Sequence, residues 1–177
     1  SRQPSPAWFC RSAPMAAGMQ MQRRLTQINV QFAARGWPKL AVGVGINTGV
    51  MTVGDMGSRE RKAYTVLGDA VNLGSRFEGL TAHYGVGIII GEATRQASPD
   101  YLCRELDRVQ VRGRAESLAI FEPLCAADQL SAQQHAELDL WHQALAHYRA
   151  QAWDAADAAL ERLAQGAPAS RLYARYR

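Results

Sequence analysis

Asn72 and Arg76 form the pair of residues in this sequence that is best suited to chemistry. They are four residues apart, so their side chains project side by side if the segment is helical. Arginine presents a permanently charged planar fork that suits phosphate oxygens, and asparagine can donate to and accept from a sugar. The pair indicates a surface that faces a ligand. The simpler alternative is that Arg76 forms a surface ion pair with Glu78 or Asp69.

A helix over residues 70–82 is the element that would position this pair. Leu73, Phe77 and Leu80 recur at i, i+4 and i+7, which is the spacing of a buried helical face. The polar pair falls on the neighbouring stripe of the same helix. We therefore expect the pair to be held at the edge of the core face.

The surrounding patterns predict a mixed α+β fold. Met15 to Ala34 shows helical periodicity, and Glu92 to Gln96 suggests a short helix. Apolar segments bounded by glycines and polar turns indicate strands. We expect a hairpin of residues 40–46 and 49–53 around the turn 47–49, followed by a polar loop over 54–61. Further strands are expected at 63–67, 86–90, 102–111 and 118–123.

From about Ser131 the composition becomes rich in Ala, Gln and Leu, which predicts helices. Asp154 is a fair N-cap for the second of them, and the pattern partly resembles one tetratricopeptide unit. The expected organisation is a disordered or truncated end over 1–14, a partial α+β domain over 15–125 and an α-helical extension over 131–177. Two helical stripes define the extension: Leu138, Trp141, Leu145 and Tyr148, then Trp153, Ala156, Leu160 and Leu163.

Composition narrows the class of protein. The chain has 177 residues, 47% of them hydrophobic, and a net charge of +4 from scattered Lys and Arg, which argues against a nucleic-acid partner. Its three cysteines are far apart and indicate neither a disulfide framework nor a Cys-x-x-Cys metal site. No apolar run of about 18 residues could span a bilayer. We expect a cytoplasmic protein, in which any membrane tether lies in an upstream segment.

Residues 42–92 carry several ordered motifs: GINTG at 45–49, GDMGS at 54–58 and YTVLGDAVNLGSRFE at 64–78. Together with VRGR at 111–114, they resemble the class III adenylate and guanylate cyclases from about Met15 to Pro123. The resemblance implies an incomplete ferredoxin-like nucleotidyl cyclase domain that works as a homodimer, with the nucleotide at the subunit interface. It also implies the conversion of ATP to cyclic AMP and pyrophosphate in intracellular signalling.

The resemblance assigns roles to residues. Asn72 would orient the ribose, and Arg76 would stabilise the charge on the α-phosphate during attack by the 3′-hydroxyl. Thr65 lies where many members read the purine, and a hydroxyl there goes with adenine. Its β-branched side chain would also be explained by strand propensity alone. Arg112 and Arg114 stand where members carry phosphate-binding Lys, although a solvated turn explains them nearly as well.

The resemblance also implies two catalytic Mg or Mn ions, whose aspartate ligands lie in family segments earlier than the helix that begins near Met15. Asp55 and Asp69 fall in motifs with other roles in the family and do not replace those ligands. We therefore expect no metal site in this chain, a second cyclase subunit as partner, and little activity of the chain alone.

Other readings remain open. The substrate could be GTP, or the chain could be a non-catalytic interaction module whose C-terminal helices dock a partner. Substitution of Trp141 and Trp153 would test the second alternative.

Two other patterns in the sequence do not form recognised sites. His142 and His147 are five residues apart and do not form a zinc motif, and His135 adds none. The glycines between residues 43 and 49 lead into a strand and not into a helix, so they are no dinucleotide fingerprint.

Overall fold

The computed structural model describes residues 13–57, 62–110, 117–126 and 129–177. It is an α+β structure, as predicted, and its elements follow the expected order. None of the helices in these ranges combines the length and the apolar composition that crossing a membrane requires. In chain order the elements are α1 (Ala13–Ala34), β1 (Val44–Ile46), β2 (Thr52–Gly57), β3 (Lys62–Leu67), α2 (Asp69–Tyr84), β4 (Ile88–Gly91), α3 (Glu92–Ala97), β5 (Tyr101–Gln110), β6 (Ser117–Ala126), α4 (Ala132–Arg149), α5 (Trp153–Gly166) and α6 (Arg171–Tyr176).

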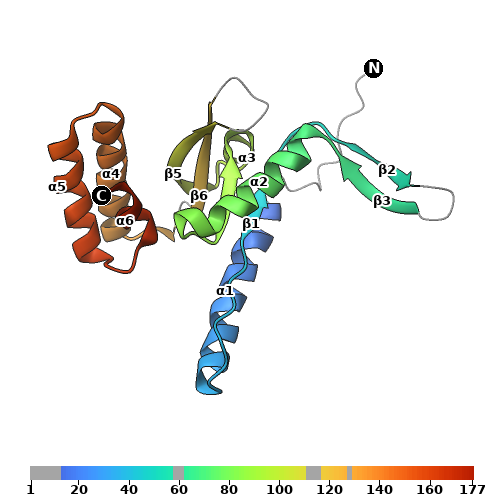
Figure 1. Ribbon diagram of the computed structural model, residues 1–177, viewed down its shortest axis with the longest axis horizontal. Helices are drawn as coiled ribbons and strands as arrows, with labels where there is room; N and C mark the ends of the chain where they lie inside the picture. The colour runs from blue at the N-terminus through green and yellow to red at the C-terminus, as the bar shows by residue number, and fades with distance from the viewer. Residues whose placement is uncertain (1–12, 58–61, 111–116, 127–128) are drawn as a thin grey trace.

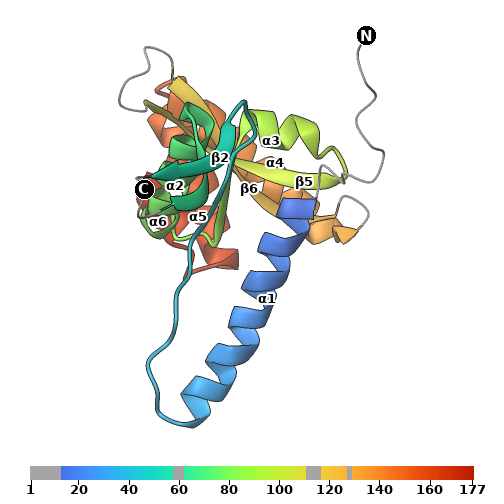
Figure 2. The same ribbon diagram turned by 90° about the vertical axis from the view of Figure 1, so that its right-hand side faces the viewer.

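The strands form one four-stranded sheet and one separate hairpin. The sheet has the order β1-β4-β6-β5, with β1 parallel to β4 and the other neighbours antiparallel. The hairpin is made of β2 and β3, and it extends away from the rest of the molecule (Figure 1). In Figure 2 helix α1 also projects from the sheet, and the chain that follows it runs back alongside.

The predicted hairpin of residues 40–46 and 49–53 is wrong. Val44–Ile46 pairs in parallel with Ile88–Ile90, while the next strand pairs with β3 and extends to Gly57, into the expected polar loop. The reason lies in the fully buried strand β4, whose backbone groups need partners on both edges. Strand β6 satisfies one edge and β1 the other, so β1 is not available for a local hairpin.

Each face of the sheet has its own core. Successive residues of β4 point to opposite faces, and Ile89 joins one buried cluster while Ile88 and Ile90 join the other. Met15 of α1 covers the second cluster. The first cluster contains residues of α2 together with residues of α4, α5 and α6. The C-terminal helices therefore share a core with the sheet and with α2.

The caps of the C-terminal helices differ in part from expectation. Ser131 caps α4 in a capping box with Gln134. Asp154 was expected to cap the next helix, but α5 begins at Trp153, so Asp154 lies within its first turn. There the carboxylate meets the positive end of the helix dipole, which is also favourable. A third, short helix, α6, begins at Arg171, after α5 ends at Gly166.

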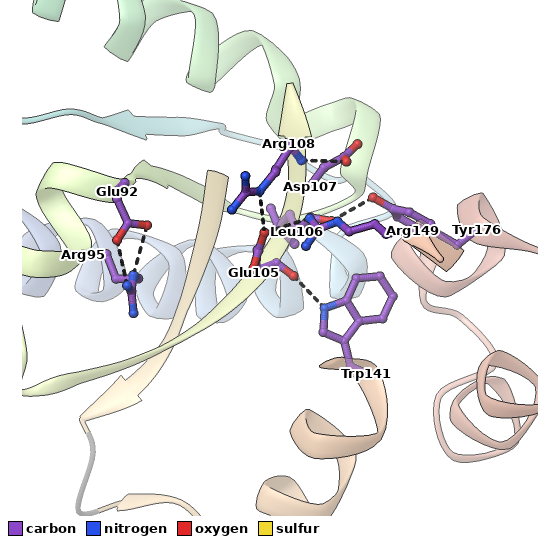
Figure 3. A network of polar contacts seen from close by, with 9 residues as sticks. All are labelled: Glu92, Arg95, Glu105, Leu106, Asp107, Arg108, Trp141, Arg149 and Tyr176. Carbon is purple, nitrogen blue, oxygen red and sulfur yellow. Dashed lines mark hydrogen bonds and ion pairs between the residues drawn. The ribbon is translucent and has the colours of Figure 1, made fainter. Parts of the chain in front are cut away.

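The C-terminal helices also cover the free edge of the sheet, which is strand β5. Glu105 pairs with Phe121 and Asp107 with Ile120, so Leu106 is the extra residue of a β-bulge. Trp141 Nε1 donates to the Glu105 carbonyl oxygen at 2.6 Å. The Tyr176 hydroxyl donates to the Leu106 carbonyl oxygen at 2.8 Å (Figure 3). Two edge carbonyls are thus satisfied by side chains, which protects the edge from pairing with another strand.

Candidate functional site

Helix α2 presents Asn72 and Arg76 to solvent, as the sequence predicts. Leu73 and Phe77 anchor the helix in the core at 5% and 1% exposure, and Leu80 is partly buried against the same cluster. Asn72 and Arg76 are both exposed, one turn apart on the neighbouring stripe. The buried face fixes the orientation of the helix, so the polar pair is held on a rigid element.

Gly68 sets how the chain passes from β3 into α2. Its φ of 154° and ψ of 161° fall in a region that is essentially restricted to glycine. The backbone amides of Val71 and Asn72 both donate to its carbonyl oxygen. Substitution of this glycine would therefore disturb the junction that fixes the direction of β3, and with it Thr65, relative to the polar pair.

Thr65 is exposed on β3, in the strand that leads into α2. Its partner across the hairpin is Gly54, and a Cβ added at Gly54 would meet nothing within 4 Å. The surface beside the Thr65 hydroxyl is thus open. Thr65, Asn72 and Arg76 come from one continuous strand-turn-helix unit. Arg112 and Arg114 lie outside the described residues.

Sequence reasoning missed a cavity of about 490 Å³ beside the first turns of α2. Asn47, Thr48 and Gly49 of the GINTG segment line one side of it together with Val50, and α2 contributes Asp69 and Phe77. Neither Asn72 nor Arg76 is part of this lining. The repeated glycines of the segment indicate that another part of the chain packs closely against its backbone. That other part is distant in the sequence, so no local pattern identifies it.

The GINTG segment also ties three elements together. Asn47 Nδ2 donates to the Ala70 carbonyl oxygen of α2 at 3.0 Å, and the Thr48 and Thr94 hydroxyls lie 3.0 Å apart. A Cβ at Gly49 would lie 2.6 Å from the Ala70 Cβ, a distance that real Cβ atoms do not show. Glycine at this position therefore permits the end of β1 to pack against the start of α2.

The described residues do not fit a metal centre, since no three His, Cys, Asp or Glu side chains among them gather closely enough to hold an ion. Asp55 lies on β2 and Asp69 at the start of α2, and both are exposed. Burial lowers the pKa of His142, so its ring is neutral at pH 7.

Comparisons with known proteins identify relatives of this chain. Residues 7–121 match the sequence model of the adenylate and guanylate cyclase catalytic domain. The chain is 38% identical over 114 residues to an adenylate cyclase of Anabaena cylindrica, which covers 60% of this chain and 23% of that protein. It is 34% identical over 105 residues to adenylate cyclase 1 of Rhizobium meliloti, covering 59% and 16%. The chain thus spans less than a quarter of these relatives.

Solved structures show the same fold. The crystal structure of the adenylyl cyclase CyaB from P. aeruginosa superposes with a TM-score of 0.60 at 30% identity, covering 68% of this chain and 62% of that one. The crystal structure of the guanylyl cyclase Cya2 gives a TM-score of 0.61 at 29% identity, covering 73% and 66%. The partial sheet and the helices around it therefore match those of solved cyclases.

Proposed function

This chain belongs to the family of adenylate and guanylate cyclase catalytic domains, and we propose from that premise that it acts in the conversion of ATP to cyclic AMP and pyrophosphate. The curated relatives in Anabaena and Rhizobium are both adenylate cyclases, which supports ATP as the substrate. Because ATP is a cytoplasmic metabolite, the proposal places the reaction in the cytoplasm.

The observation that carries the proposal is the exposed Asn72 and Arg76 pair on the anchored helix α2. In the proposed reaction, Asn72 hydrogen-bonds the ribose and orients its 3′-hydroxyl towards the α-phosphorus. The hydroxyl loses its proton to water, and its oxygen forms the new bond to phosphorus as the bond to pyrophosphate breaks. Arg76 donates to the α-phosphate oxygens, whose charge grows in the transition state. One such preorganised donor contributes on the order of 10²- to 10³-fold in rate.

Thr65 is the proposed contact to the base. Its hydroxyl can accept a hydrogen bond from the adenine amino group. The open surface opposite Gly54 leaves room for a planar ring next to this hydroxyl. The discrimination between ATP and GTP would then depend on one exposed side chain of β3.

We propose that a second cyclase subunit closes the site and supplies the ligands of the Mg or Mn ions. Electrostatic stabilisation of a transition state is much stronger where water is excluded, whereas Thr65, Asn72 and Arg76 are exposed. Large apolar side chains are also exposed on the segments that lead to α2, with Val50 at 96% and Tyr64 at 77% exposure, which suits a protein partner. The chain alone is expected to turn over very little ATP.

GTP is the second candidate substrate, because the guanylyl cyclase Cya2 superposes on this chain as well as the adenylyl cyclase does. To test both, the chain is assayed alone and mixed with a catalytic domain of the Anabaena relative in which the residues aligned with Asn72 and Arg76 are replaced by alanine. We expect cyclic AMP only in the mixture. Cyclic GMP as the main product would reject ATP, and robust turnover by the chain alone would reject the need for a partner.

A further inference from the structure

A second cavity, of about 540 Å³, lies where helices α3 and α4 meet strands β5 and β6. Its charged lining consists of Glu92, Arg95, Glu105, Arg108 and Arg149. None of these residues belongs to the proposed catalytic set. The volume is within the range of small-molecule sites. This cavity is a neighbour of the one beside α2, because Glu92 and Ala119 line both.

Two arginines from different elements converge on one oxygen atom in this cavity. Arg149 Nη2 of α4 lies 2.7 Å from Glu105 Oε1, and Arg108 Nε of β5 lies 3.8 Å from the same oxygen (Figure 3). Two guanidinium groups that face one anionic oxygen form the arrangement that binds a carboxylate or a phosphate. Here the chain's own Glu105 carboxylate occupies the position.

A third arginine raises the positive charge of the cavity. Arg95 of α3 lies over the Phe121 ring, 4.8 Å from its centroid, and its Nη2 is 2.7 Å from Glu92 Oε1. Three arginines face two glutamates, which leaves one positive charge in excess. The other titratable groups of the lining add none at neutral pH, since burial lowers the pKa of His142 and raises the pKa of the Cys103 thiol to about 11.

The neighbouring surface is suited to the body of a small ligand. Phe121 and Ala119 of β6 and Leu145 and Ala146 of α4 provide apolar lining next to the charged groups. The Glu105 backbone is fixed by the hydrogen bond from Trp141, whereas its side chain is 23% exposed and can turn outwards. An incoming anion can therefore replace the Glu105 carboxylate without any movement of the sheet.

We propose that this cavity binds the oxyanion group of a small molecule, a phosphate or a carboxylate, which replaces the Glu105 carboxylate between Arg108 and Arg149. Glu105 then acts as an internal competitor for the site. The proposal does not depend on the proposed cyclase function, because it uses different residues and a different part of the fold.

The test is calorimetric titration of the full chain with inorganic phosphate, and separately with acetate, at constant ionic strength. Glu105→Gln keeps the shape of the side chain and removes its charge, so it is expected to bind the anion about tenfold more tightly than the unaltered chain. Arg108→Gln and Arg149→Gln are expected to bind it at least about tenfold more weakly. Binding of acetate alone, with the same pattern among the variants, would assign the site to carboxylates.

Arg162→Gln is the matched control, because it removes an exposed arginine of α5 that is not part of the cavity lining. It is expected to leave the affinity unchanged. Arg108 and Arg149 are 62% and 36% exposed, so their variants should fold, which circular dichroism checks. The proposal is overturned if neither anion binds the unaltered chain or Glu105→Gln. It is also overturned if binding is equal in Arg108→Gln, Arg149→Gln and Arg162→Gln.

Discussion

Replacement of Trp141 by phenylalanine tests whether the C-terminal helices are an integral part of the fold. Trp141 is 0% exposed, and its Nε1 donates at 2.6 Å to the Glu105 carbonyl oxygen at the edge of the sheet. Phenylalanine keeps the aromatic packing and removes the donor. Trp153 offers a matched comparison, because it lies in the same group of helices but is 56% exposed.

The expected loss of stability has two parts. Leaving the half-buried Glu105 carbonyl oxygen without its donor costs about 1–3 kcal/mol. The phenyl ring is roughly 40 Å³ smaller than the indole ring, and at about 24 cal/mol per Å³ of cavity this adds roughly 1 kcal/mol. Trp141→Phe should thus lower the free energy of unfolding by about 2–4 kcal/mol. Trp153→Phe should change it by no more than about 0.5 kcal/mol.

Urea denaturation followed by circular dichroism measures both values without relying on tryptophan fluorescence. The shared core predicts one cooperative transition that moves to lower urea in Trp141→Phe. Equal effects of Trp141→Phe and Trp153→Phe would refute the conclusion that the helices are an integral part of the fold. A separate transition of the helices that alone responds to Trp141→Phe would refute it as well, since the helices would then be an independent unit.

Two further predictions concern a glycine and a thiol. A Cβ at Gly45 would lie 2.0 Å from the Gly74 carbonyl oxygen, so Gly45→Ala should lower the free energy of unfolding by about 1–3 kcal/mol. Gly54→Ala faces open space and should change the urea midpoint little; equal midpoints for the two variants would contradict this contrast. Burial raises the pKa of Cys103 from 9.0 to about 11. Alkylation of Cys103 at pH 8 should therefore be about a hundredfold slower than alkylation of an exposed cysteine. A rate equal to that of an exposed cysteine would contradict the burial of Cys103. The Cys103 thiol loses its proton at a lower pH in the unfolded chain than in the folded one. The free energy of unfolding should therefore fall as the pH rises from about 9 to about 11.

Local patterns were sufficient to predict most elements and the polar pair. The spacing of Leu73, Phe77 and Leu80 predicts both the helix and the stripe on which Asn72 and Arg76 lie, because helical geometry is local. The antiparallel strands on either side of residues 111–116 were predicted for a similar reason. Here too the pairing partners are close in sequence.

Long-range pairing could not be read from the sequence. The parallel partner of β1 lies about 40 residues further along the chain, and nothing local distinguishes it from a hairpin partner. The hydrogen bonds that Trp141 and Tyr176 donate to the edge of β5 depend on a bulge at Leu106, which no sequence pattern indicates. The convergence of Arg108 and Arg149 on Glu105 joins positions separated by more than 40 residues and appears only after folding.

The role of Arg76 in catalysis is tested by the production of cyclic AMP in the mixture of this chain with the complementing cyclase domain, measured for Arg76→Ala. We predict that this variant lowers the rate by about 10²- to 10³-fold. Arg162→Ala, an exposed arginine on α5 outside the proposed site, should leave the rate unchanged. Full cyclic AMP production by the Arg76→Ala mixture would contradict the role of this chain in the reaction.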